Sequence, residues 1–162
     1  MEVISTKEPD ELQVRQMHQL NQQNTPEVGD VSDIENFKQL IKFSEYILLA
    51  EKESKLIGFM LCMKQDQNYQ SKNYLYLSNK FSEFLYVDRI AIGKKYRRLG
   101  IGKAIYEKII EAANLKKVPL LCEVNTKPKN DPSLAFHKYL GFEEIGKYDF
   151  EDSSVVYLKK EC

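Results

Sequence analysis

The stretch GKKYRRLGIGK, Gly93 to Lys103, decides how this chain folds. Its eleven residues hold five cations, three glycines and no acid, in a chain whose charges otherwise balance. An apolar run at 84–92 precedes it and predicts a β-strand, and the segment 101–115 that follows predicts a helix. The helix prediction rests on an apolar stripe at near-helical spacing, formed by Ile101, Ile105, Ile109 and Ala112.

A strand that leads into glycines and cations and then into a helix is suited to holding phosphate. The first N–H groups of a helix lack partners inside it, and the helix dipole adds partial positive charge there. Gly100 and Gly102 let an oxyanion approach the main chain, while Arg97, Arg98 and Lys103 neutralise its remaining charge. The loop therefore predicts a pyrophosphate site. The alternative is a solvated basic turn, because short glycine motifs are common.

The remaining chain alternates between strand and helix patterns in the order β-α-α-β-β-β-α-β-α-β-β. The first helix carries Leu12, Met17 and Leu20 on one face, and the second follows Ser32, which begins a capping box. The least regular part is the polar loop 64–74. Strands are expected at 2–5, 46–52, 55–64, 84–92, 118–124, 142–150 and 154–160. Besides the helix after Ser32, helices are expected at 11–24, 101–115 and 132–140.

Composition predicts one soluble α/β domain over residues 1–162. Hydrophobic residues make up 43% and charged residues 30% of the chain, and no linker or repeat divides it. With 24 basic and 24 acidic residues, no overall field attracts nucleic acid or an anionic membrane. Any anion site must therefore be local.

Cysteine usage and hydropathy favour a cytoplasmic location. Cys62, Cys122 and Cys162 are odd in number, and the first two lie inside apolar runs that strands would bury. The first ten residues lack an apolar targeting segment, and no stretch approaches the ~20 apolar residues of a membrane span. His18 has no Cys or His at ligand spacing, so no metal site is expected.

The basic loop also matches a family signature: Arg or Gln, two residues, Gly, one residue, then Gly or Ala. Upstream lies RIAI, 89–92, and downstream lies SLAFHKYLGFEEIG, 133–146. With these segments in this order, the chain resembles the GNAT superfamily of acyl-coenzyme-A-dependent N-acetyltransferases. Within it, the chain is similar to a bacterial subfamily of predicted acetyltransferases whose substrates are not established. The signature residues are Arg97, Arg98, Leu99, Gly100, Ile101 and Gly102.

The resemblance implies a mixed, mostly antiparallel seven-stranded sheet with four helices, splayed between strands 4 and 5. It implies acetyl-CoA as acyl donor, with its pantetheine arm in the gap and no metal. By position, main-chain groups of Ile90, Ala91 and Ile92 would pair with that arm, and Asn130, Ser133 and His137 would contact it. Residues Arg97 to Lys103 would hold the pyrophosphate.

Three side chains are candidates for proton transfer. The family's usual general acid is a helix tyrosine, and the matching position here is His137, which could equally be a surface hydrogen-bonding residue. Strict alternation along 84–92 places Tyr86, Asp88, Ile90 and Ile92 on one face and Val87, Arg89 and Ala91 on the other. Asp88 or Glu123 could receive the amine proton, and the alternative for each is an ion pair with Arg89 or a lysine.

The residue pattern indicates the acceptor site less directly than the donor site. By resemblance it lies between the first two helices and the loop after the hairpin, which points to Asn21, Asn24, Tyr76 and Tyr86 as contacts. Any of these could instead be a polar helix end or a core tyrosine. We expect a primary amine of a small molecule as acceptor, and a protein N-terminus or lysine as the alternative. A coenzyme-A-binding sensor without activity is the rival from another class, and the expected assembly is a monomer or homodimer.

Overall fold

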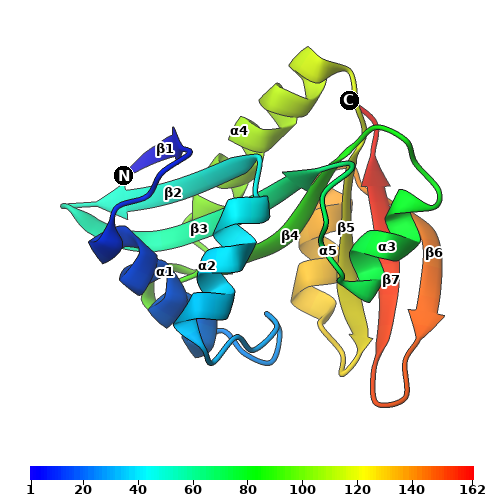
Figure 1. Cartoon of the computed structure of the whole chain (residues 1–162), viewed down its shortest axis with the longest axis horizontal. Coiled ribbons are helices and arrows are strands. Elements are labelled where there is room, and N and C mark those ends of the chain that lie inside the picture. The colour runs from blue at the N-terminus through cyan, green and yellow to red at the C-terminus, as the bar shows by residue number, and fades with distance from the viewer.

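The computed structural model describes all 162 residues as one seven-stranded sheet flanked by helices (Figure 1). The strands are β1 (Glu2–Thr6), β2 (Tyr46–Lys52), β3 (Lys55–Lys64), β4 (Leu85–Ile92), β5 (Leu120–Lys127), β6 (Glu143–Asp149) and β7 (Ser154–Lys160). The helices are α1 (Glu11–Gln23), α2 (Ile34–Phe43), α3 (Lys72–Ser78), α4 (Ile101–Lys116) and α5 (Asp131–Tyr139), with a short 3₁₀ turn η1 (Lys94–Tyr96) before α4.

The sheet has the order β1-β2-β3-β4-β5-β7-β6 and divides into two halves between β4 and β5. All neighbouring strands are antiparallel except β4 and β5, which are parallel. These two pair only at Leu85 with Leu120 and at Tyr86 with Leu121. Beyond that point they diverge, as Figure 1 shows, so the predicted splayed, mostly antiparallel sheet is confirmed.

A core packs on each face of the sheet. Helices α1, α2 and α3 cover one face, where Met17, Phe37 and Tyr74 are fully buried or nearly so. Helices α4 and α5 cover the other, where Ile105 and Ile109 are fully buried. Both cores include side chains of β4 and β5, so helices on both faces help to define the gap between these strands.

Helix α3 was not expected, because its residues were predicted to begin in a polar loop. It is short, and its N-terminus is capped by Ser71, whose hydroxyl accepts from the Tyr74 amide at 3.4 Å. Burial of Tyr74 and Leu77, three residues apart, holds this single helical face against the core. Seven residues are too few for a convincing periodicity, which explains why the pattern did not reveal it.

Several local predictions are corrected at the helices. The second helix is capped by Asp33 and not by Ser32, because the Asp33 carboxylate accepts from the Glu35 amide at 2.9 Å. Leu12 is 62% exposed, so it does not share the buried face of α1 with Met17 and Leu20. On α4 the buried alanine is Ala113, one residue beyond the predicted Ala112, as expected when a stripe of period 3.6 continues.

Candidate functional site

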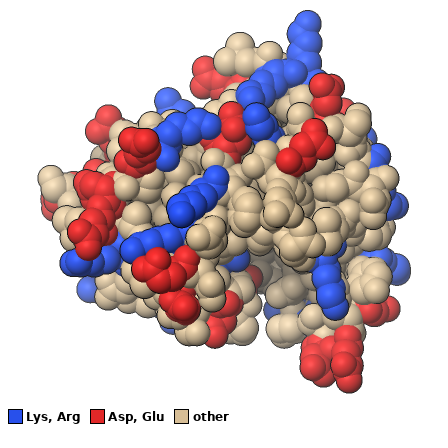
Figure 2. Space-filling model, in the orientation of Figure 1, with Lys and Arg blue, Asp and Glu red and all other residues tan.

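A cleft of about 950 Å³ lies where β4 and β5 diverge. Its walls come from the loop between α1 and α2, from β4 and β5, from the N-terminal turns of α4 and α5, and from the segment before α3. Figure 2 shows the face that carries α1, α2 and α3, hollowed between the two halves, with positive and negative side chains mixed across it. The face seen in Figure 2 thus carries charges of both signs around the cleft.

One end of the cleft is built to hold an anion. Gly100 precedes α4 with a left-handed φ of 81°, and no side chain caps this helix, so its first N–H groups stay open. Arg97, Arg98 and Lys103 also line the cleft. A cationic loop around open N–H groups fits the pyrophosphate of coenzyme A by the chemistry of its donors.

The edge of β4 along the cleft is open to a strand-like ligand. Residues Ile90, Ala91 and Ile92 pair with β3 on one side, but β4 pairs with β5 only at its first two residues. The side chains of Ile90 and Ile92 line the cleft, whereas the Ala91 side chain is buried on the opposite face. An extended arm bearing amides could pair with the free main-chain groups, and this fits pantetheine.

A β-bulge in β4 breaks the predicted alternation of its side chains. Leu61 pairs with Arg89 and Cys62 pairs with Val87, so Asp88 has no partner on β3. Tyr86 and Ala91 therefore pack on the α1 and α2 face, while Ile90 and Ile92 pack on the α4 face. The prediction that Tyr86, Ile90 and Ile92 share a face was wrong for this reason.

Asp88, a candidate base, lies in a nearly dry ion pair. Its carboxylate contacts the Arg89 Nε at 2.8 Å and accepts from the Tyr69 hydroxyl at 2.8 Å. The Asp88 side chain is only 4% exposed and that of Arg89 only 10%. Both carboxylate oxygens are thus already engaged, although Asp88 lines the cleft.

Glu123, the other candidate base, lines the cleft from β5 with a pKa near neutrality. Burial raises its pKa to about 7, and the charge of Asp88 adds to this, against the opposing hydrogen bond from Tyr86. The Tyr86 hydroxyl lies 2.5 Å and 3.0 Å from the two carboxylate oxygens. Because burial and the Glu123 charge raise the pKa of Tyr86 far above its usual value, this tyrosine stays protonated and donates.

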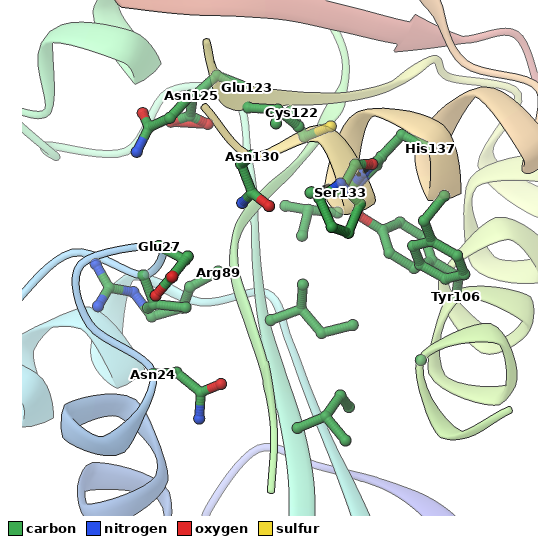
Figure 3. Close-up of a pocket in the computed structure, with 18 of the residues that line it drawn as sticks. Asn24, Glu27, Arg89, Tyr106, Cys122, Glu123, Asn125, Asn130, Ser133 and His137 are labelled. Carbon is green, nitrogen blue, oxygen red and sulfur yellow. Dashed lines mark hydrogen bonds between the residues drawn. The ribbon is translucent and has the colours of Figure 1, made fainter. Parts of the chain in front are cut away.

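His137, the candidate acid, has partners on both ring nitrogens. Nδ1 lies 2.7 Å from the Ser133 carbonyl, which can only accept, so Nδ1 carries the proton. Nε2 lies 2.6 Å from the hydroxyl of Tyr106 on α4 and accepts from it. Burial lowers the pKa of His137, which favours this neutral form. Figure 3 shows Ser133 and His137 facing Tyr106 across the two helices.

Five further predicted contacts lie in different environments. Asn24 lines the cleft and its amide oxygen accepts from Arg97 Nη2 at 2.6 Å. Asn130 lines it from the start of α5. Asn21 is fully buried behind the cleft wall, Tyr76 stacks on Tyr157 at 4.0 Å between ring centroids, and Leu99 is 66% exposed; none of these three lines the cleft.

Sequence reasoning missed much of the cleft wall. Tyr69 and Asn73 belong to the stretch where no helix was expected, and Tyr106 is hidden inside the apolar pattern of α4. Arg89 was assigned to the opposite face because the bulge leaves no trace in the residue pattern. Two segments carried a usable signal. Asn24 was predicted and its neighbours Glu27 and Gly29 also line the cleft, and the loop after the hairpin, which holds Tyr69 and Asn73, was expected on the acceptor side.

No three His, Cys, Asp or Glu side chains converge as ligands of a metal ion would. None of the helices combines the length and the apolar character needed to cross a bilayer.

Comparison with known proteins identifies the family. Residues 14–142 match the sequence model described as Acetyltransferase (GNAT) family. A search of curated proteins found no match. Among solved structures, a Streptococcus mutans protein superposes with a TM-score of 0.74 at 17% identity, over 99% of each chain.

Two other similar structures have named activities. A ribosomal-protein-alanine N-acetyltransferase from Brucella melitensis has a TM-score of 0.73 at 19% identity, over 100% of each chain. An aminoglycoside 6'-N-acetyltransferase complexed with coenzyme A has a TM-score of 0.74 at 11% identity, over 99% of this chain and 97% of the other. At these identities the likeness establishes a shared fold and leaves the acceptor open.

Proposed function

The chain belongs to the GNAT acetyltransferase family, and from this membership we propose that it moves the acetyl group of acetyl-CoA to a primary amine of a small molecule. One observation carries the proposal. A single cleft joins an open helix N-terminus with three adjacent cations to Glu123, a carboxylate whose pKa is about 7. These are the two things that amine acetylation needs from a protein: an anion anchor for the donor and a base near neutral pH.

We assign donor binding to the N-terminal turn of α4 and the open edge of β4. The α4 N–H groups with Arg97, Arg98 and Lys103 would hold the pyrophosphate, and the main chain of 90–92 would pair with the pantetheine arm. Asn130 and Ser133, from the start of α5, would contact the same arm from the opposite wall. This arrangement directs the thioester toward the point where β4 and β5 separate.

Glu123 is the proposed general base. An acceptor amine enters as an ammonium ion, and a carboxylate with a pKa near 7 can take its first proton at neutral pH. Acetyl-CoA supplies the acyl group: the C–N bond forms, the C–S bond breaks, and the second proton that nitrogen loses neutralises the departing sulfur. Tyr86 holds the Glu123 carboxylate in place through its hydroxyl.

Direct transfer between two bound substrates is favoured over an acyl-enzyme. Cys122 is the cysteine that lines the cleft, and it is 3% exposed. Burial, reinforced by the Glu123 charge, raises the pKa of its thiol well above the usual value, so it stays protonated and weakly nucleophilic. All three cysteines are free, which fits a reducing, cytoplasmic setting.

A small acceptor is favoured by the walls around Glu123. Tyr69 and Ser71 before α3 and Asn73 in its first turn line the cleft, as do Glu27 and Gly29 on the α1–α2 loop. Two walls of this kind enclose a compact ligand more readily than an extended peptide. An amino acid derivative, a polyamine or an amino sugar are the classes we propose to test first.

The decisive experiment combines binding with turnover. Calorimetric titration with acetyl-CoA should give micromolar binding, and release of free thiol should then appear with one member of a panel of small primary amines. Glu123→Gln should keep the binding and lose turnover. Turnover with peptide N-termini alone would show that the acceptor is a protein N-terminus and not a small amine. Binding of acetyl-CoA without turnover on any amine would support a coenzyme-A-binding sensor.

A further inference from the structure

We propose that Arg89 is a positioning residue that holds both walls of the acceptor side of the cleft against the bulge of β4. The inference rests on the proposed acetyltransferase function, because it concerns how that site receives the amine. Arg89 was not expected to reach the cleft, yet the bulge turns it there beside Asp88. Figure 3 shows Arg89 beside Glu27, on the wall opposite α5.

The first wall is the loop between α1 and α2. Arg89 Nη1 donates to the Asn21 amide oxygen at 2.8 Å and to the Gly29 carbonyl at 3.1 Å. The Asn21 amide nitrogen donates to the same carbonyl at 3.1 Å. One guanidinium nitrogen thus links β4 to the end of α1 and to the loop, next to the cleft-lining residues Glu27 and Val28.

The second wall is the segment before α3, which is connected through Asp88. Arg89 Nε donates to one oxygen of the Asp88 carboxylate at 2.8 Å, and the Tyr69 hydroxyl donates to the other at 2.8 Å. Tyr69 also packs against Phe43 and Tyr74. The Arg89–Asp88 pair therefore lies between two loops that are about 40 residues apart in the sequence.

Burial stabilises the hydrogen bonds that Arg89 and Asp88 make to the two loops. The Arg89 and Asp88 side chains are 10% and 4% exposed, so water cannot readily replace their hydrogen bonds. Charge-assisted hydrogen bonds of this kind are stronger than neutral ones and their loss leaves a buried partner unsatisfied. The anion anchor at α4 has no hydrogen bond to Arg89 and contacts the held loop only where Arg97 donates to Asn24, so removing the guanidinium should disturb the acceptor side more than donor binding.

The test compares Arg89→Met with Arg15→Met, a matched control. Arg15 lies on the exposed face of α1 in a solvent-accessible pair with Glu11. We expect Arg89→Met to raise the KM for the acceptor roughly tenfold or more, with the acetyl-CoA dissociation constant changed less than about twofold. Arg15→Met should change neither. Tyr69→Phe, which frees only the second wall, should give a smaller rise in the acceptor KM.

Hydrogen exchange supplies a readout that needs no acceptor. Arg89→Met should speed amide exchange in residues 24–31, and Tyr69→Phe should speed it in residues 66–71. Arg15→Met should leave exchange in both segments unchanged. If Arg89→Met does not fold, Arg89→Lys serves instead, because it keeps the charge and loses the fork of donors. Unchanged exchange in both loops, or a loss of acetyl-CoA affinity equal to the rise in acceptor KM, would overturn the inference. Faster exchange in both loops without turnover on any amine would contradict the proposed function but still support the positioning role of Arg89.

Discussion

The carboxylate of Glu123 lies inside the cleft, where burial and the nearby charge of Asp88 raise its pKa to about 7. The Tyr86 hydroxyl opposes that shift by favouring the charged form. The group is therefore balanced between protonation states in the range where an enzyme works. Both its chemistry and its effect on stability can be tested by changing pH.

Activity should rise with pH through about 7. Below that value Glu123 holds a proton and cannot accept another, so kcat/KM should fall about tenfold per pH unit on the acid side. Tyr86→Phe removes the donor that favours the charged carboxylate and should move this limb roughly one unit higher. A pH profile of kcat/KM for the parent and Tyr86→Phe measures both effects. An acid limb that stays in place in Tyr86→Phe would assign the titration to another group.

The same pKa predicts that Glu123 destabilises the fold at alkaline pH. Between its ordinary value of 4.5 and about 7 the folded protein keeps a proton that the unfolded chain releases, so the stability from this group falls as pH rises. Glu123→Gln should thus be more stable than the parent at pH 8, by on the order of 3 kcal/mol, with the difference vanishing toward pH 4. Urea unfolding at several pH values measures it. A constant difference across that range would contradict the raised pKa.

His137 should matter more for stability than for turnover. His137→Phe leaves the Tyr106 hydroxyl without its partner in a buried place and removes the side-chain hydrogen bond to the Ser133 carbonyl, at a cost of about 1–3 kcal/mol. Because its single proton is already donated inside α5, we expect kcat to fall less than about threefold. Tyr106→Phe is the matched control, since it removes the other half of the same hydrogen bond. A fall of a hundredfold in kcat with unchanged stability would restore His137 as the general acid.

At the scale of elements, the loop before α4 offers a charge-matched experiment. Arg97 and Arg98 line the cleft, whereas Lys94 and Lys95 lie in η1 and do not. The double variant Arg97→Ala, Arg98→Ala should lose at least about tenfold in acetyl-CoA affinity, and Lys94→Ala, Lys95→Ala should lose little. Both remove two positive charges, so calorimetry separates direct phosphate contact from a general field. Equal losses would mean that the loop acts only through its net charge.

The same elements show what a residue pattern can and cannot predict. Helix α4 was predictable because its apolar stripe spans several turns. The glycine at its start was also informative, because Gly100 adopts a left-handed conformation there. Helix α3 was not, because tertiary burial of Tyr74 and Leu77 stabilises so short a helix. The bulge at Asp88 depends on pairing with β3, which no single segment encodes. Consequently the loop of the anion anchor was predicted and the two segments of the acceptor walls were expected by resemblance, while the place of Arg89 required the structure.

At the scale of the whole molecule, two half-sheets share only two residue pairs between β4 and β5. The cleft between them is also the proposed donor site, so acetyl-CoA would occupy the place where a full strand pairing is missing. A ligand that binds only the folded state stabilises it by mass action. Binding between β4 and β5 should therefore slow amide exchange in these strands as well as raise the overall stability.

We expect acetyl-CoA at a hundred times its dissociation constant to raise Tm by about 5–10 °C, from a stabilisation of about 2.7 kcal/mol. Amide exchange should slow in residues 89–92 of β4, whose free main-chain groups would gain partners, and remain unchanged in β1, at the far edge of the sheet. Differential scanning fluorimetry and hydrogen exchange measure these effects, with Arg97→Ala, Arg98→Ala as the variant that should lose both. A rise in Tm without slower exchange in 89–92 would show that the donor binds elsewhere than between β4 and β5.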